Sequence, residues 1–378
     1  MTTVVRKTGS AAGARSVRLR RPSWWWVVPL AVVAFLVAAP ELGVSGIGLL
    51  PGAVNNPGSL QVLGTVLAVT GLAVSFDVLM GYTGLVSFGH GMFFALGAYS
   101  FVLTLAYTPL NFPEAILAAI GIGIAGSIIV NGIALKTTRI AYSMITLAVA
   151  QLLAVVISDG YLDSGGIDGV VLPADKIPAM YVGILNTKNA YWTALIVTLI
   201  VIALCKWITG TKYGRVWQGI RENELRASVL GYNTYVYKLV ASVFGSLMAS
   251  ICGIAYALVL GIADPSVTSL GFSIGLVIML VLGGRGRIWG AIVGAVAYEM
   301  LELRLPTLSG VSGIASLPAG LKIPLSQPQV LLGAIFILFV LFLPNGLAGL
   351  PARLSRGVRP GSPGPRPAPG KTPDLQSR

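Results

Sequence analysis

The sequence predicts an all-α, polytopic membrane protein, and its composition gives two reasons. Hydrophobic residues make up 55% of the 378-residue chain, whereas its 26 basic and 13 acidic residues make up only 10%. A soluble domain carries roughly 25% charged residues, so a chain with this few charges could not cover a water-facing surface. The composition therefore excludes an ordinary soluble enzyme, and the 47 glycines are typical of closely packed membrane helices.

Apolar runs long enough to cross a bilayer recur along the chain. A helix of about 20 mostly apolar residues spans the hydrocarbon core, and we expect about ten such helices. The third run is interrupted by four glycines, so it is either a full span or a re-entrant segment. The ten expected ranges are 24–40, 60–80, 84–108, 114–135, 140–158, 190–208, 238–262, 268–283, 288–305 and 329–344.

The positions of the charges predict the orientation. With the N-terminus in the cytoplasm, ten spans place 22 of the 26 basic residues on the cytoplasmic side, together with both termini. The outer segments instead collect acidic residues, namely Glu41, Glu114, Asp159, Asp163, Asp168, Asp175, Asp264 and Glu302. The net charge of +13 is therefore an orientation signal and favours contact with membrane lipid, not with nucleic acid.

The two ends differ from the membrane domain, which we place at 24–350. Residues 1–23 are basic and 351–378 are rich in Pro, Gly, Ser and Arg, so we expect both to be disordered in the cytoplasm. Gly370-Lys371-Thr372 lacks the earlier glycine that a phosphate loop needs, because position 365 is Pro365. The chain also has a single histidine and two separated cysteines, so we expect no nucleotide, metal or other cofactor site in it.

The cytoplasmic loop 209–237 is the most informative polar segment. Ile220, Glu224 and Ala227 follow the spacing of one helical face, and Gly231 stands where a helix would end. The spacing predicts a short surface helix between two membrane helices. On the residues alone, a basic loop lying on anionic lipid is an equal alternative.

A family resemblance adds to this reading. Gly214-Arg215, Ile220-Arg221-Glu222-Asn223-Glu224, Ala227 and Gly231 resemble the coupling-helix motif of permease subunits in ABC importers. Over about 60–350 the chain is similar to the branched-chain amino acid permease family, on its M-type subunit. Four more stretches agree in order: the glycine-rich segment 81–99, Ser164-Gly165-Gly166-Ile167-Asp168-Gly169, Leu282-Gly283-Gly284-Arg285-Gly286-Arg287, and Pro344-Asn345-Gly346-Leu347-Ala348-Gly349.

The resemblance implies a multi-pass permease subunit of an ABC importer in a bacterial cytoplasmic membrane, and not an enzyme. It implies three kinds of partner: a second permease subunit, two cytoplasmic ATPase subunits that bind the ATP, and an extracytoplasmic solute-binding protein. Branched-chain or related amino acids would be the substrate. Contact with the ATPase would fall to Gly214, Arg215, Ile220, Arg221, Glu222, Asn223, Glu224, Ala227 and Gly231, with Arg221, Glu222 and Glu224 as its charged groups.

The candidate translocation pathway lies between the second and third expected spans. An intramembrane carboxylate is costly and usually faces a cavity or a partner, so Asp77 either handles substrate or pairs at the helix end with Lys136 or Arg139. The single histidine is either part of the pathway or makes an interhelical hydrogen bond. The predicted pathway residues are Asp77, Gly81, Gly84, Ser87 and His90.

The outer loop 159–189 carries a second cluster of glycines. Gly165, Gly166 and Gly169 allow backbone angles closed to other residues, and Asp168 favours a turn. These four residues are therefore either a tight turn or a gate and docking surface for the solute-binding protein.

Two other functions stay open. An importer of urea or short amides is the first, because the urea permeases are close relatives of the resembled family. A stand-alone secondary transporter or channel is the second. It would need its own coupling-ion or proton site, and Asp77 and His90 alone are few groups for a proton relay.

Overall fold

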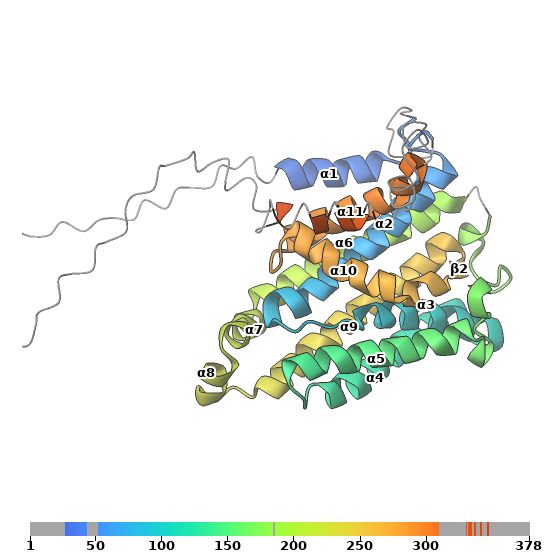
Figure 1. Ribbon diagram of the computed structural model, residues 1–378. Helices are drawn as coiled ribbons and strands as arrows, with labels where there is room; N and C mark the ends of the chain where they lie inside the picture. The colour runs from blue at the N-terminus through green and yellow to red at the C-terminus, as the bar shows by residue number, and fades with distance from the viewer. Residues whose placement is uncertain are drawn as a thin grey trace, which may run out of the picture.

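The computed structural model describes residues 27–43, 52–183 and 186–309, with a few positions between 330 and 347. Its long helices pack side by side in a bundle (Figure 1). The α-helices are α1 (Val27–Ala38), α2 (Pro57–Asp77), α3 (His90–Tyr107), α4 (Phe112–Ala134), α5 (Arg139–Ser158), α6 (Thr187–Gly210), α7 (Lys212–Glu222), α8 (Glu224–Val229), α9 (Thr234–Leu260), α10 (Leu270–Gly283) and α11 (Ile288–Ser309).

The helices confirm an all-α polytopic membrane protein. Six described helical segments are long and apolar enough to cross a membrane: α2 with its continuation to Thr83, α3, α4, α5, α6 and α9. The third expected span is among them, although α3 begins only at His90, after the irregular link 84–89. The count of ten spans stays a prediction. The other four expected ranges, 24–40, 268–283, 288–305 and 329–344, are not among the six, and most of the last one lies outside the described residues. The two termini, 1–23 and 351–378, lie outside them as well.

Three helices form the centre of the bundle. Within the membrane windows of α2, α3 and α9, 83, 72 and 67% of the residues are buried, against 22, 22 and 28% for α4, α5 and α6. Glycines let the central backbones touch. A Cβ at Gly97 of α3 would meet the backbone of Ser250 in α9, and one at Gly253 of α9 would meet the carbonyl of Phe94. The outer three helices present apolar side chains outward, as lipid-facing helices do.

The end of α2 carries an irregular turn. The helix continues as a π-helical turn, η2 (Val78–Thr83), and stops at Gly84, whose φ of 73° is left-handed. The link 84–89 then leads into α3. Because this link lies beside α7, the glycine-rich segment reaches the end of the bundle that carries α7 and α8.

A tight hairpin joins α10 and α11. A Cβ at Gly283 would meet the carbonyl of Gly290, and one at Gly294 would meet the carbonyl of Met279. The residues between the two helices, 284–287, form a short turn in which Gly284 and Gly286 have positive φ. The small residues therefore fix how closely the two helices approach.

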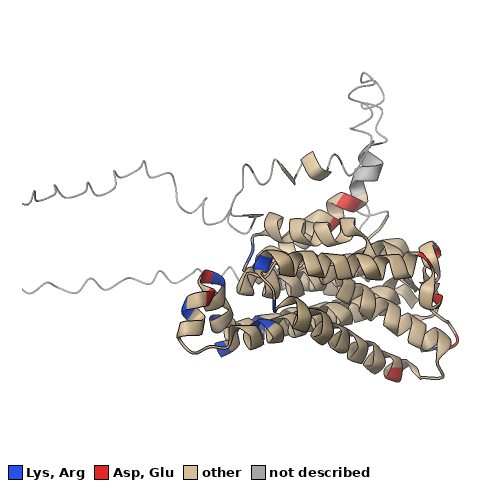
Figure 2. Cartoon of the chain, turned by 60° about the horizontal axis from the view of Figure 1, so that its bottom comes forward, with Lys and Arg blue, Asp and Glu red and all other residues tan. Residues whose placement is uncertain are grey.

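The two ends of the bundle differ in charge. Lysine and arginine gather around α7 and α8, and acidic residues dominate the opposite end (Figure 2). Among the residues that the structure describes, that opposite end holds four short 3₁₀ turns and a strand pair, in which β1 (Val170–Val171) pairs antiparallel with β2 (Ile262–Ala263). The 3₁₀ turns are η3 (Tyr161–Asp163), η4 (Gly166–Asp168), η5 (Ala179–Tyr181) and η7 (Pro265–Thr268).

Candidate functional site

The loop 209–237 folds into two short helices at an angle to each other. Helix α7 begins after Thr211, and Gly214 is required there because a Cβ would meet the carbonyl of Thr209. Asn223 has extended angles, φ −157° and ψ 104°, and its side chain caps α8 by accepting from the amide of Arg226 at 2.9 Å. Gly231 follows with a φ of 88°, which ends the second helix. The two predicted glycines and Asn223 therefore shape the loop.

One aromatic residue fastens α7 to the bundle. Trp217 is fully buried, and its indole Nε1 donates to the carbonyl of Tyr237 in α9 at 2.9 Å. The rings of Tyr213 and Tyr237 lie against each other, with centroids 5.7 Å apart. The sequence reasoning missed Trp217, yet a signal was present. Trp217 stands three positions before Ile220, the other large buried side chain of α7, so the two share one helical face.

Arg221 connects α7 to the end of α2. Its guanidinium donates to the main-chain carbonyl of Gly81, in the π-helical turn. Glycines line its seat: a Cβ at Gly84 would lie 3.0 Å from Cγ of Arg221, and one at Gly286 would lie 2.8 Å from its Nη1. Glycines from two separate motifs thus leave room for one arginine side chain.

Asp77 holds the same junction from the membrane side. Its side chain is fully buried, and Oδ1 accepts from the amide of Gly286 at 2.8 Å. The partner is therefore a backbone amide of the α10–α11 turn, and not Lys136 or Arg139. A Cβ at Gly81 would collide with the carboxylate of Asp77. Arg221 thus bonds to the π-helical turn after α2, and Asp77, which directly precedes that turn, bonds to the α10–α11 turn.

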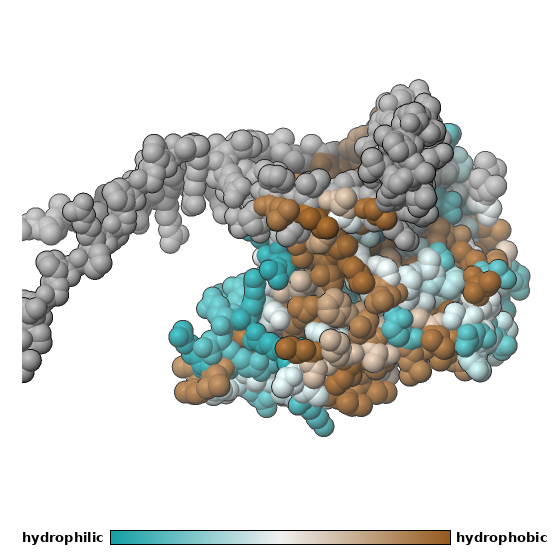
Figure 3. All heavy atoms as spheres, viewed as in Figure 1, coloured by the Kyte–Doolittle hydropathy of each residue, from teal (hydrophilic) through white to brown (hydrophobic). Residues whose placement is uncertain are grey.

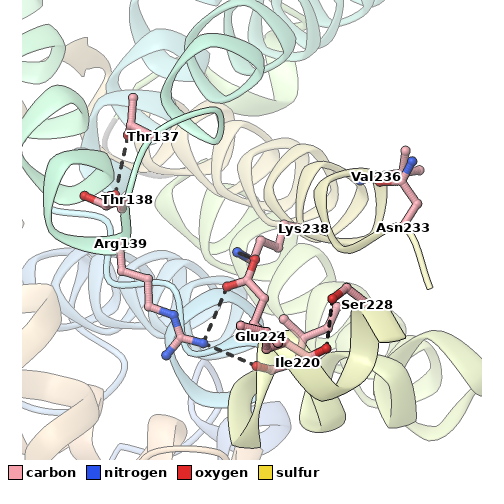
Figure 4. Close-up of polar contacts among 10 residues, drawn as sticks. Thr137, Thr138, Arg139, Ile220, Glu224, Ser228, Asn233, Val236 and Lys238 are labelled. Atoms are coloured by element: carbon pink, nitrogen blue, oxygen red, sulfur yellow. Dashed lines mark hydrogen bonds and ion pairs between the residues drawn. The ribbon is translucent and has the colours of Figure 1, made fainter. Parts of the chain in front are cut away.

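A shared carboxylate makes the third connection. Glu224, the first residue of α8, pairs with Lys238 of α9 and lies 3.7 Å from the guanidinium of Arg139, the first residue of α5 (Figure 4). Arg139 also donates to the carbonyl of Ile220 at 3.3 Å. Arg221 and Glu224 therefore face the membrane helices, whereas Glu222 lies on the open side of the loop.

The open side of the loop has a groove and an apolar tip. A hollow of about 210 Å³ lies between α7 and α8, lined among others by Arg215, Glu222, Arg226 and Tyr232. Leu225, Val229 and Leu230 are 75, 80 and 71% exposed. In the space-filling view this end of the molecule is mostly polar with a hydrophobic patch at its tip (Figure 3). Exposed apolar patches rimmed by polar groups are a feature of protein–protein and membrane interaction sites.

The family-model comparison identifies the chain. Residues 58–340 match the model described as branched-chain amino acid transport system / permease component. The chain belongs to this family. The matched range contains the loop, its three anchors and the α10–α11 turn.

Individual relatives agree with the family. The permease is 26% identical to the high-affinity branched-chain amino acid transport system permease protein LivH of Salmonella typhimurium, over 74% of this chain and 91% of the relative. It is 22% identical to LivM of the same organism, over 72% of each chain, and 20% identical to BraD of Pseudomonas aeruginosa, over 74% of this chain and 91% of the relative. The relative named LivM fits the resemblance to the M-type subunit, and the relative named LivH matches this chain as well. The permease is thus a multi-pass protein of a bacterial cytoplasmic membrane.

The remaining predicted pathway residues lie in the packed interior of the permease. His90 is buried, its Nε2 is 3.0 Å from Oγ of Ser75, and its ring stacks on Phe76 with centroids 5.1 Å apart. Ser87 is buried as well. His90 thus makes the interhelical hydrogen bond that was the alternative to a pathway role. That Asp77, Gly81, Gly84, Ser87 and His90 line the pathway stays a prediction.

The outer loop of the permease is built around its glycines. Gly165, Gly166 and Gly169 all have positive φ, and a Cβ at Gly169 would meet the carbonyl of Ala263 beside the β1–β2 pair. Asp168 is exposed. Large apolar side chains are exposed beside it, namely Tyr161, Leu162, Ile167, Val171 and Met180. The loop is thus a structured surface, and its use as a gate or docking site stays a prediction.

Proposed function

We propose that this permease forms part of the membrane pathway of an importer for branched-chain or related amino acids, driven by ATP hydrolysis in two separate cytoplasmic ATPase subunits. The observation that supports this proposal most is the arrangement of the α7–α8 loop. Its inner side is fastened to α2, α5 and α9, and its outer side offers a groove and an apolar tip. Such a loop suits the transmission of force from a docked protein into the membrane helices.

The proposed mechanism divides the predicted coupling residues into two sets. Arg215, Glu222 and the tip of α8 would meet the ATPase, where rim charges set register more than affinity. Gly214, Ile220, Arg221, Asn223, Glu224, Ala227 and Gly231 would hold the shape of the loop and its anchors. Movement of the loop would then shift the segment 77–90, and the pathway would open beside it.

The proposed assembly contains a second permease subunit and a solute-binding protein. Relatives named LivH and LivM both match the chain, which supports a pair of permeases. The exposed apolar side chains of the outer loop, with acidic Asp159, Asp163, Asp168 and Asp175 among them, would receive the solute-binding protein.

Reconstituted uptake tests the proposal. The permease is purified with the proposed second permease and two ATPases, and placed in liposomes with the binding protein outside and ATP inside. We expect uptake of radiolabelled leucine that depends on both ATP and the binding protein. Uptake of urea in place of leucine would favour the amide importer. Uptake without any ATPase would overturn the importer and favour a secondary transporter or channel.

A further inference from the structure

We propose that Arg139 is a positioning residue that links α5 to the coupling loop and releases it during the transport cycle, while Lys238 holds the loop on α9 throughout. The inference rests on the proposed function and names the membrane helix that moves first. Figure 4 shows the arrangement: Arg139 and Lys238 approach Glu224 from two different helices.

The contacts of Arg139 place it at the bend between α7 and α8. Its Nη2 lies 3.3 Å from the carbonyl oxygen of Ile220, near the end of α7, and 3.7 Å from the carboxylate of Glu224, which begins α8. One guanidinium therefore touches both helices of the loop. A change in the angle between α7 and α8 would break at least one of these two contacts.

The two cations that meet Glu224 differ in exposure. The side chain of Lys238 is 9% exposed, whereas that of Arg139 is 50% exposed. An ion pair in water contributes little because solvent screens it, but a buried cation that loses its partner is costly. Lys238 therefore stays with Glu224, and the contact of Arg139 is the one that gives way.

The packing of the two helices agrees with this division. α9 is a central helix with 67% of its membrane window buried, whereas only 22% of the α5 window is buried. A displacement of α5 therefore costs less packing than a displacement of α9. α5 is also joined to the link 84–89, because Ser143 Oγ donates to the carbonyl of Val86 at 2.6 Å. Movement of α5 would thus reach the predicted pathway segment.

Substitution of Arg139 in the complete reconstituted importer tests the inference. Arg139→Gln removes the charge, and Lys136→Gln is the matched control, because Lys136 lies in the same cytoplasmic turn and its side chain makes no ion pair with a described residue. We expect Arg139→Gln to assemble and to hydrolyse ATP normally, while leucine transported per ATP falls at least fivefold. Lys136→Gln should keep the wild-type ratio.

Hydrogen exchange gives a readout that a purely structural role would not move. In the wild-type complex, a non-hydrolysable ATP analogue should speed amide exchange at the start of α5, residues 139–145, and leave the start of α9 protected. Arg139→Gln should show the faster exchange without nucleotide.

Three outcomes would overturn the inference. They are a wild-type transport ratio in Arg139→Gln, an equal loss in Lys136→Gln, or exchange in α5 that ignores the nucleotide. A wild-type complex without ATP-dependent uptake would instead overturn the proposed function, and the inference with it.

Discussion

Arg221 of the α7–α8 loop donates a hydrogen bond to the main-chain carbonyl of Gly81, 140 residues earlier in the chain. The aliphatic part of the Arg221 side chain lies against Gly84 and its guanidinium against Gly286, and Asp77 accepts a hydrogen bond from the amide of Gly286. Three distant segments, η2, α7 and the α10–α11 turn, therefore meet at one point. This junction connects the loop to the end of α2 and to the α10–α11 turn.

Substitutions of Asp77 distinguish a role as a hydrogen-bond acceptor from a role for its negative charge. An acceptor for the Gly286 amide can be an amide oxygen, so Asp77→Asn should keep most of the uptake. Asp77→Leu removes the acceptor of that half-buried amide, which costs up to about 1–3 kcal/mol, and should lower both thermal stability in detergent and uptake. If Asp77→Asn folds normally but transports nothing, the carboxylate itself handles substrate or a proton.

The α10–α11 hairpin should not tolerate a methyl group at its contact. Gly294→Ala places a Cβ against the carbonyl of Met279, and overpacking of this kind costs about 1–3 kcal/mol. Gly121→Ala in α4 is the matched control, since nothing lies within 4 Å of its added Cβ. Thermal melting of the purified permease should show a loss only for Gly294→Ala. Equal melting temperatures for Gly294→Ala and Gly121→Ala would show that the α10–α11 contact has room for a methyl group.

The pair Lys238–Glu224 should behave as a buried ion pair. Glu224→Ala leaves the Lys238 ammonium buried and unpaired, and breaking a buried pair costs roughly 3–5 kcal/mol. The cost here should be nearer the lower bound, because the Glu224 side chain is 36% exposed. The double variant Lys238→Met with Glu224→Gln should recover most of the melting temperature. A double variant no better than Glu224→Ala would mean that the pair is not the anchor.

The class of protein and the important segments could be predicted from the sequence. The low charge, the apolar runs and the distribution of basic residues along the chain are properties of the amino-acid sequence itself, so they can be recognised without a structure. The motifs containing Gly81, Arg221 and Gly286 were all recognised. Their meeting point was not, because no local rule links residues 77, 221 and 286.

The directions of the charged side chains also could not be predicted. Arg221 and Glu224 were expected on the ATPase side of the loop, and the structure directs both toward the membrane helices. Helical spacing fixes which residues share a face, but not which way that face points. Because Glu224 contacts the buried Lys238, a charge reversal at Glu224 would also disturb folding and is a poor test of coupling alone.

The apolar tip of α8 should decide assembly with the ATPase. Val229 is 80% exposed, so Val229→Glu should leave the fold of the permease unchanged. It places a charge in an apolar contact, and we expect the ATPase to be lost on co-purification. Val229→Leu keeps the apolar surface and should retain the ATPase. Normal co-purification of Val229→Glu would place the docking surface elsewhere.

The central claim is that the loop transmits the work of the ATPase to the membrane helices through the junction of Arg221 with Gly81. The number of leucine molecules imported per ATP hydrolysed, measured in proteoliposomes for wild type and Arg221→Ala, tests it most directly. We expect Arg221→Ala to retain its ATPase subunits and their hydrolysis but to lose most of the leucine imported per ATP. A variant that assembles and keeps the wild-type ratio would contradict it.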